Sequence, residues 1–330
     1  MAKFKAFQIF NEDGKVRGRI VDLSLEELDR GEVVIKTAWS SVNFKDALAA
    51  TGAGKIIRRF PCVGGIDGCG TVESSSDPRF TPGDPVICTS YDVGVAHDGG
   101  YAEFMRVPAG WVVPLPKGMS LFESMALGTA GYTAGLAVVR MEHEGLKPAN
   151  GPVIVTGATG GVGSVAIDIL AGAGYHVVAL TAKESETDYL KALGAKDVMF
   201  RSSLDLTRIK PLDKASWAGA VDNLGGDVLS WLASNMHVGG TLASIGLAAS
   251  HTFNTTVMPF ILRGVSLLGV DSVNTPMPLR QKVWERLATD LKPRHLRTMI
   301  TTVDLDQLPP VFERILKAQM KGRTVIKLAG

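Results

Sequence analysis

The chain has 330 residues, and its 35 Lys and Arg against 33 Asp and Glu leave a formal net charge of only +2. This near-balance argues against the strongly basic surface that binds nucleic acid or an anionic membrane, so we expect neither partner. A chain of this length predicts two domains, each with its own hydrophobic core. Glycine accounts for 37 residues, about 11% against about 7% in average proteins, which indicates tight turns and close approaches of the backbone to a ligand.

Residues 1–124 carry the pattern of strands and turns. Residues 33–36 form a short β-rich run, and the turn at 82–85 leads into another apolar run at 86–88. Prolines at positions 108, 114 and 116 argue against a helix there. We therefore predict a mostly β domain for this part of the chain.

From Ser124 onward, apolar strands alternate with helical segments. Strands that are almost wholly apolar and alternate with helices indicate a doubly wound parallel sheet covered on both faces. We place this α/β domain at residues 125–294. Its predicted helices are 124–139, 163–170, 187–193, 227–236 and 257–263. Its predicted strands are 153–155, 176–180, 198–200, one that begins at 220–221, 241–245 and 266–270.

The tail returns to the β domain. Residues 308–320 have apolar side chains at helical spacing, and residues 324–328 form a closing strand. Such a strand would fill the edge that the first domain leaves open. We therefore expect 1–124 and 295–330 to form one domain and 125–294 the other.

The cysteines Cys62, Cys69 and Cys88 are odd in number and form no disulfide framework, so we interpret them as small core residues. The six histidines are scattered singly and no Cys-x-x-Cys occurs, so we predict no metal site. Residues 1–7 lack the apolar segment of a signal peptide, and the longest uncharged run, 148–167, is too rich in Gly, Ser and Thr for a membrane helix. We expect a cytoplasmic protein.

The most informative stretch is the glycine turn that follows the strand at 153–155. Gly157, Gly160 and Gly163 recur every three residues between this strand and a helix. Glycines let the backbone approach a pyrophosphate, and the helix N-terminus presents free N–H groups and a positive dipole end. The turn therefore predicts dinucleotide binding, although a turn that only packs helix against sheet would look similar.

The end of the next strand indicates which dinucleotide binds. An NAD site has an acidic residue about 20 residues beyond the turn, where it holds the ribose 2′-hydroxyl. Here that place is taken by Thr181, followed by Lys183, and Arg201 ends the next strand. A hydroxyl and two cations suit a 2′-phosphate, so we predict NADPH. The alternative is that Lys183 and Arg201 are ordinary surface charges.

Several segments in order along the chain carry a family resemblance. They are 39–48 (Trp-Ser-Ser-Val-Asn-Phe-Lys-Asp-Ala-Leu), 54–61, 65–67 (Gly-Ile-Asp), 97–103, 128–134, the glycine turn, 255–263, 269–273 and 322–324. In them the chain resembles the zinc-free quinone-oxidoreductase branch of the medium-chain dehydrogenase/reductases. More closely it is similar to the YhdH-type group, the NADPH-dependent acryloyl-CoA reductases.

This resemblance implies a GroES-like β domain, a Rossmann domain, a homodimer and a nicotinamide held between the domains. Zinc-dependent relatives carry a metal-binding cysteine where this chain has Asn43. The common tyrosine is replaced by Phe44 and the common arginine by Lys183, which cannot clamp phosphate bidentately, so we expect weaker NADPH affinity. The implied cofactor contacts are Phe44, Thr159, Gly160, Gly161, Val162, Thr181, Ala182, Lys183, Arg201, Leu247, Ile261, Ser272 and Gln319.

The implied reaction reduces acryloyl-CoA to propionyl-CoA by hydride transfer to the β-carbon, without a metal. We expect Asn43 and Lys45 to orient or polarise the substrate, Asp46 to hold Lys45, and Arg323 to lie near the cofactor. The structural alternatives are that Asn43 caps a helix starting at Phe44, that Lys45 and Asp46 form a solvated pair, and that Arg323 is a strand-end charge.

Further candidates concern the acceptor. Lys55, Arg58 and Arg59 form a basic segment that suits the phosphates of CoA, or else a solvated charged face. Tyr91 either faces the substrate or packs in its turn. An NADPH:quinone oxidoreductase is the alternative enzyme, and a non-catalytic NADPH-binding sensor is the alternative of another class.

Overall fold

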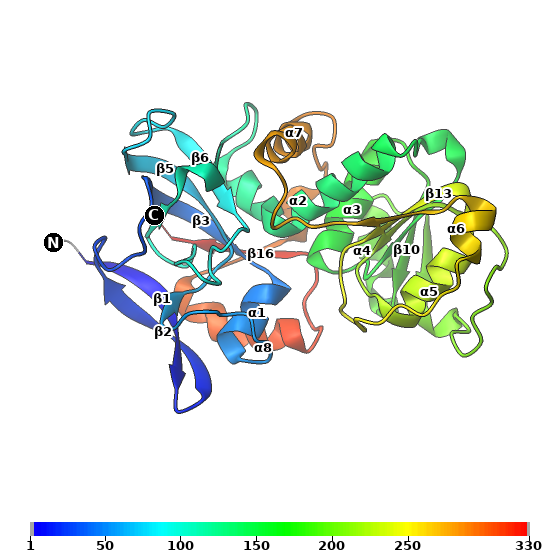
Figure 1. The fold of residues 1–330 in the computed structure, drawn as a ribbon, viewed down its shortest axis with the longest axis horizontal. Coiled ribbons are helices and arrows are strands. Elements are labelled where there is room, and N and C mark those ends of the chain that lie inside the picture. Colours follow the sequence, from blue (N-terminus) through cyan, green and yellow to red (C-terminus); the bar gives the residue numbers. More distant parts are fainter. Residues whose placement is uncertain (1–2, 329–330) are drawn as a thin grey trace. The chain divides into compact units, whose positions relative to one another are not determined.

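The computed structural model describes residues 3–328, which form two compact units (Figure 1). The first unit takes in the described residues of Met1–Thr129, Val273–Lys282 and Leu296–Gly330, and the second takes in Ala130–Ser272 and Val283–His295. The sequence assigned 273–282 to the nucleotide-binding domain, whereas in the structure this segment packs with the first unit.

The first unit is built from two sheets. Strands β2-β1-β4 form a small antiparallel sheet, and a seven-stranded sheet has the order β15-β16-β3-β5-β6-β8, with β7 also paired to β3. The Asp13–Gly14 turn joins β1 to β2, and both residues adopt the positive φ that such a hairpin needs. The strands are β1 (Phe4–Glu12), β2 (Lys15–Leu23), β3 (Val33–Val42), β4 (Cys62–Val63), β5 (Asp67–Ser75), β6 (Pro85–Thr89), β7 (Phe104–Val107), β8 (Val112–Pro114), β15 (Ile300–Val303) and β16 (Arg323–Lys327).

The C-terminal tail closes this unit, as the sequence predicted. β16 pairs antiparallel with β3, and the helices α1 (Phe44–Thr51) and α8 (Leu308–Leu316) pack on one another. Phe312 of α8 meets Phe7 and Tyr101 in a cluster of aromatic rings. The helix predicted for 308–320 ends at Leu316, because Ala318 adopts a left-handed φ of 53° that no helix continues through.

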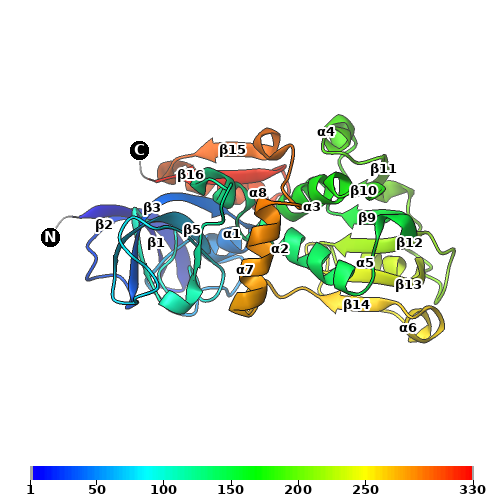
Figure 2. The same ribbon diagram turned by 90° about the horizontal axis from the view of Figure 1, so that it is seen from above.

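The second unit is a six-stranded parallel sheet in the order β11-β10-β9-β12-β13-β14 (Figure 2). This is the Rossmann order. The strands β10 and β11 are added on one side of β9 and the next three on the other, and this change of side leaves a crevice at the carboxyl ends of the strands. The strands are β9 (Val153–Thr156), β10 (Val177–Thr181), β11 (Asp197–Phe200), β12 (Trp217–Asp222), β13 (Met236–Ser244) and β14 (Ser266–Gly269).

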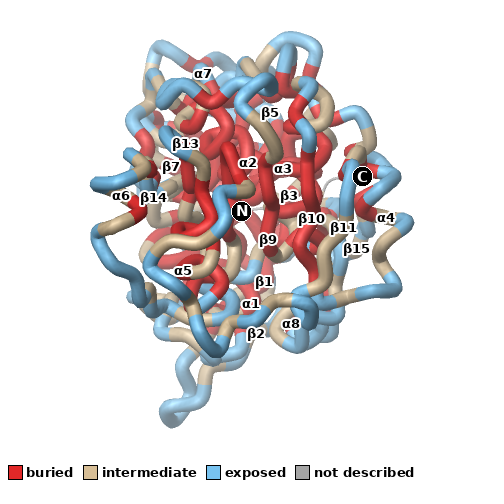
Figure 3. Tube along the Cα trace, turned by 90° about the vertical axis from the view of Figure 1, so that its right-hand side faces the viewer, coloured by how far each residue is buried: buried red, intermediate tan, exposed pale blue. Residues whose placement is uncertain are grey.

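The helices of this part follow the predicted alternation, with one addition. In Figure 3 the central strands β9 and β10 and the helix α3 are buried along most of their length. α7 was not predicted, although the prolines at 276 and 278, followed by apolar residues at helical spacing, are the signal for it. The helices are α2 (Leu121–His143), α3 (Gly161–Gly172), α4 (Thr187–Ala192), α5 (Gly226–Ser234), α6 (Met258–Arg263) and α7 (Met277–Ala288).

Candidate active site and nucleotide pocket

A small pocket opens at the carboxyl ends of β9 and β10 in the second unit. Its volume is about 120 Å³, and it lies where doubly wound sheets bind nucleotides. Six of the predicted cofactor residues line it together with Leu180 and Leu224. These six are Gly157, Thr159, Thr181, Ala182, Lys183 and Arg201.

The glycine turn fits a bound pyrophosphate. Gly157 has a φ of 57°, in the left-handed region that favours glycine. A Cβ on Gly163 would overlap the carbonyl oxygen of Gly157, so this position also requires glycine. α3 begins directly after Gly160. The first N–H groups of a helix and the positive end of its dipole point toward its N-terminus, which here is the glycine turn. The turn therefore offers a cradle of backbone donors for an anion.

The remaining wall of the pocket has the polarity of a phosphate site. Thr181 ends β10 and its hydroxyl accepts a hydrogen bond from the Lys183 N–H at 3.0 Å. Arg201 follows β11 directly. The lining set holds these two cations and no carboxylate. A ribose diol would need an acid here, so the residues present fit a 2′-phosphate.

The other predicted cofactor residues lie outside this pocket. Gly160, Gly161 and Val162 form the turn and the start of α3. Leu247 and Ile261 are exposed side chains of the second unit. Ser272 is the last residue of the segment Ala130–Ser272 of the same unit. In the first unit Phe44 is 45% exposed, which is unusual for a large apolar side chain, and Gln319 is exposed. Their contacts with a cofactor remain predictions.

In the first unit, a polar cluster gathers around the buried carboxylate of Asp67, and we call it the Asp67 cluster. Asp67 accepts hydrogen bonds from Ser41 Oγ at 2.5 Å, Asn43 Nδ2 at 2.7 Å and Thr129 Oγ1 at 2.5 Å, and from the Thr129 N–H at 2.9 Å. Four hydrogen bonds from three residues therefore converge on this carboxylate. The cluster comprises Ser41, Asn43, Asp46, Asp67, Thr129 and Arg323.

A break in α2 makes this arrangement possible. Gly128 has φ 53° and ψ −158°, so the helix stops and restarts at Thr129. The restarted helix directs its first N–H, that of Thr129, at the Asp67 carboxylate, where the helix dipole stabilises negative charge. A Cβ on Gly128 would overlap the side chains of Ser41, Asp67 and Arg323. Glycine is therefore required for this contact.

Arg323 is the cationic member of the cluster and is only 3% exposed. It donates to the carbonyl oxygens of Ala126 and Val42, to Asn43 Oδ1 at 3.2 Å and to Ser41 Oγ at 2.8 Å. Burial lowers the pKa of Arg323, while the carboxylates of Asp67 and Asp46 act in the opposite direction. Arg323 is thus a buried counter-ion and not an exposed strand-end charge.

Asp46 is buried as well, at 2% exposure. Its Oδ1 accepts the Ile66 N–H at 2.9 Å and its Oδ2 accepts the Asn43 N–H at 2.8 Å. Burial, and then the charge of Asp67, raise the pKa of Asp46 to about 7. Asp46 therefore holds the start of α1 and does not form the predicted pair with Lys45, buried or solvated.

Residues 29–117 match the family model for the alcohol dehydrogenase GroES-like domain, and residues 161–289 match that for the zinc-binding dehydrogenase domain. The acrylyl-CoA reductase AcuI of Ruegeria pomeroyi is 47% identical over 315 residues, covering 96% of either chain. The chain belongs to the YhdH group of medium-chain dehydrogenase/reductases.

Solved structures of this group have the same fold. The yhdH oxidoreductase from Salmonella enterica in complex with NADP has a TM-score of 0.96 and 44% identity, covering 98% of this chain and 100% of that one. The Bacillus subtilis protein yhfP with NAD bound has a TM-score of 0.97 and 47% identity, covering 99% of this chain and 100% of that one. The name of yhfP assigns it a quinone oxidoreductase activity only provisionally.

The basic segment of this YhdH-group chain is largely neutralised by carboxylates. Arg58 pairs with Asp92 at 3.1 Å. Arg59 pairs with Asp29, and with Asp98 at 3.3 Å, so its charge serves the packing of the loop. Lys55 is exposed and makes no ion pair within residues 3–328. A role for this segment in binding CoA therefore rests on Lys55 and Arg58.

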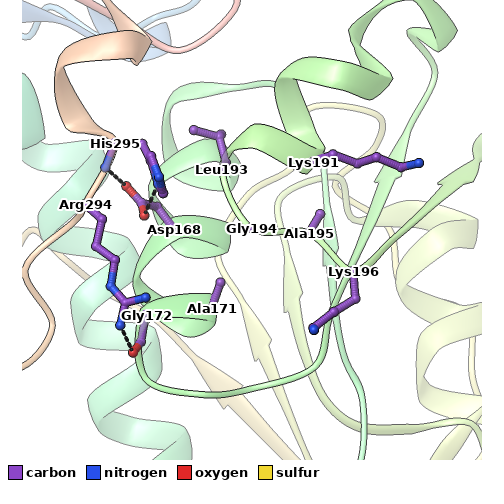
Figure 4. A pocket seen from close by; sticks show the side chains of 10 residues that line it. All are labelled: Asp168, Ala171, Gly172, Lys191, Leu193, Gly194, Ala195, Lys196, Arg294 and His295. Atoms are coloured by element: carbon purple, nitrogen blue, oxygen red, sulfur yellow. Dashed lines mark hydrogen bonds and ion pairs between the residues drawn. The ribbon is translucent and has the colours of Figure 1, made fainter.

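A second cavity of the unit, about 340 Å³, contains none of the predicted site residues. His295 donates its backbone N–H and directs Nδ1 to the buried Asp168, at 2.8 and 3.0 Å, and Arg294 donates to the carbonyl oxygen of Gly172 (Figure 4). Lys191 extends away from the His295–Asp168 pair (Figure 4). These contacts fasten the chain to the C-terminal end of α3, where cations offset the unpaired carbonyl groups.

The three cysteines are buried in the first unit, and burial raises the pKa of each thiol to about 12. They are therefore neutral core residues at ordinary pH. Residues 3–328 contain no group of three or more His, Cys, Asp or Glu that could hold a metal ion. Over the same residues, no helix is long and apolar enough to cross a membrane.

The sequence did not single out three members of the Asp67 cluster. Ser41, Asp67 and Thr129 occur only within the matching segments 39–48, 65–67 and 128–134. The signal for Thr129 was present, because a helical run interrupted by Gly128 predicts a new helix N-terminus at Thr129, which needs an acceptor for its N–H groups. The acceptor itself, Asp67, lies 62 residues away in the sequence, so local sequence patterns do not identify it.

Proposed function

We propose that the protein is an NADPH-dependent oxidoreductase that reduces the C=C bond of acryloyl-CoA to give propionyl-CoA. The 47% identity to an acrylyl-CoA reductase over nearly the whole chain carries this proposal. The pocket beside Gly157 supports the choice of cofactor, because Thr181, Lys183 and Arg201 fit a 2′-phosphate and the Gly157–Gly163 turn fits a pyrophosphate.

NADPH, when bound, supplies the hydride that is added to the β-carbon. Negative charge then develops on the thioester oxygen, and a proton must reach the α-carbon. The chain contributes binding and orientation. The glycine turn and the two cations hold the nucleotide, and the Asp67 cluster fixes residues 41–46, which include the exposed Phe44.

The geometry changes the roles proposed for Asn43 and Arg323. Both N–H groups of the Asn43 amide are directed inward, to Asp67 at 2.7 Å and to Asp46 at 3.2 Å, and its oxygen accepts from Arg323. We therefore assign Asn43, Asp46 and Arg323 to positioning. Lys45 is partly exposed and remains a candidate for direct contact with the acceptor.

The second candidate is reduction of quinones, favoured by the name given to the yhfP relative. Both reactions use the same hydride donor, and the acceptor separates them. NADPH oxidation by the purified protein is compared for acryloyl-CoA, crotonyl-CoA and a small quinone, with NADH as the control cofactor. The proposal expects rapid turnover of acryloyl-CoA with NADPH. Turnover of the quinone alone would replace it with the second candidate, and tight NADPH binding without turnover would indicate a sensor protein.

We also propose a cytoplasmic homodimer formed through the second unit. β14 is an edge strand, and four exposed apolar side chains lie on it and on or beside α6, namely Val257, Ile261, Leu262 and Leu267. Such an edge and patch suit a second copy of the same chain. Light scattering should give twice the 35.0 kDa chain mass, and Leu267→Glu should give monomers. A monomeric wild type would overturn the proposal. Cell fractionation tests the location.

A further inference from the structure

Tyr91 is held between two flat groups. Its ring stacks on Trp111 with 5.5 Å between centroids and 8° between planes, and the Arg280 guanidinium lies 4.4 Å from the ring centroid. His97 packs edge-on against Trp111 at 5.2 Å. Aromatic stacking and cation–π contact therefore fix Tyr91 through its ring.

Arg280 is itself immobile. It is fully buried and donates to the carbonyl oxygen and hydroxyl of Thr89, each at 3.3 Å, and to the carbonyl oxygen of Val273 at 3.0 Å. These bonds attach α7 and the segment before it to the end of β6. A planar guanidinium can stack and donate at once, which lysine cannot do.

The backbone beside Tyr91 is strained and joined to the Asp67 cluster. Ser90 and Tyr91 have φ values of 66° and 51°, and two consecutive residues other than glycine rarely adopt this region. The Ser90 hydroxyl lies 3.1 Å from that of Thr129, which donates to Asp67 at 2.5 Å. Strain of this kind persists where the surroundings hold the residue in a required place.

The hydroxyl of Tyr91 is the unused group in this arrangement. Within residues 3–328 it has no hydrogen-bond partner, and it is accessible and not sealed in the core. The donors of the neighbouring cluster are already engaged, since the Asn43 amide donates to Asp67 and Asp46. Trp111 and Arg280 already contact the Tyr91 ring, so its hydroxyl is the group left to meet a ligand.

We propose that the Tyr91 hydroxyl donates a hydrogen bond to the thioester oxygen of the enoyl-CoA, with Arg280 and Trp111 as the residues that position it. This inference rests on the proposed function. As hydride reaches the β-carbon, the C=C π electrons move toward the carbonyl and charge builds on that oxygen. A donor fixed in advance stabilises this charge without reorganisation.

Tyr91→Phe tests the donor, because it keeps the stack and removes the hydroxyl. The expected result is a fall in kcat with acryloyl-CoA of about 10²-fold, the size seen for loss of one oxyanion donor. NADPH affinity and the unfolding temperature should be unchanged. Tyr175→Phe is the matched control, since it removes a hydroxyl that bonds to Leu146 in the second unit, and kcat should be retained.

A double-mutant cycle tests the positioning role. If Arg280 acts through the Tyr91 hydroxyl, Arg280→Lys lowers kcat in the wild type and has little further effect on kcat in Tyr91→Phe. A purely structural Arg280 would lower kcat by the same factor in both backgrounds, which would overturn this role.

Lys45→Met decides between the two candidate donors. Wild-type kcat in Tyr91→Phe would overturn the inference while the proposed function stands, and a large loss in Lys45→Met alone would assign the donor to Lys45. Absence of enoyl-CoA turnover in the wild type would overturn both the proposed function and this inference.

Discussion

The nucleotide pocket and the Asp67 cluster are both polar, but they use their polar groups in opposite ways. In the pocket, Lys183 and Arg201 face a volume of about 120 Å³ that a ligand can enter. In the cluster, the Asn43 amide and the Arg323 guanidinium direct their hydrogen bonds to other groups of the protein, and Asp67 accepts four hydrogen bonds. Polar residues in a candidate site therefore divide into groups that meet the ligand and groups that maintain the geometry.

The largest effect is expected from removing the buried cation of the cluster. Arg323→Met leaves the Asp67 carboxylate buried without its counter-ion, which costs about 3–5 kcal/mol of unfolding free energy. Lys5→Met is the control, because the Lys5–Asp22 pair is exposed to water, which screens the two charges, and its loss should change the unfolding free energy little. Urea denaturation measures both. Similar losses in the two variants would mean that the cluster does not maintain the structure.

The next effect concerns the pocket and falls on binding. Lys183→Ala and Arg201→Ala should each weaken NADPH binding about 10- to 100-fold, since a hydrogen bond to a charged group contributes about 1.5–3 kcal/mol. NADH, which lacks the 2′-phosphate, should be affected little. Arg208→Ala, at an exposed site outside the pocket, is the control. Equal losses for NADPH and NADH in a fluorescence titration would contradict the assignment.

Asp46 links the cluster to pH. Its pKa is raised to about 7 from 3.8, so the folded state holds a proton that the unfolded state has released. The stability that this contributes is full below about pH 3.8 and is lost as the pH rises through about 7. The unfolding free energy of the wild type should therefore fall relative to Asp46→Asn between pH 5 and 7 and level off above. If the difference in unfolding free energy between the wild type and Asp46→Asn did not change with pH, Asp46 would not be the group that titrates in this range.

The smallest effect is expected in the basic segment. Lys55→Gln and Arg58→Gln together should raise KM for acryloyl-CoA a few-fold, since exposed charges in water contribute about 1 kcal/mol or less. Arg59 is left intact because its pairs with Asp29 and Asp98 belong to the loop. KM for a small quinone should not change. A rise for both acceptors would rule out recognition of CoA phosphates.

Much of the fold could be predicted from the sequence, because strands and turns depend mainly on residues that are close together in the chain. The glycine turn, most parallel strands of 153–269 and the closing strand at 323–327 were predicted within a few residues, whereas β13 begins at Met236 and not at the predicted 241. Residues that line the nucleotide pocket could be predicted for the same reason. Gly157, Thr181 and Arg201 each end or follow a predicted strand.

Tertiary contacts decide the rest of the site. That Asp46 turns to Ile66 and not to Lys45 depends on burial, which sequence spacing does not give. The pairing of Arg323 with Asn43 spans 280 residues, and the stack of Arg280 on Tyr91 also joins distant segments. Sequence patterns therefore identify the residue types of the catalytic loop and cannot show which of them are already engaged.

The most direct test of the proposed reaction follows the hydride itself. Acryloyl-CoA is incubated with the protein and NADPH carrying deuterium at both hydrogen positions of the nicotinamide C4, and the product is analysed by mass spectrometry and NMR. The account predicts propionyl-CoA with one deuterium at the β-carbon. Oxidation of the labelled NADPH that leaves no deuterium at that carbon would contradict the account. Oxidation of NADPH by a quinone but not by acryloyl-CoA would contradict it as well.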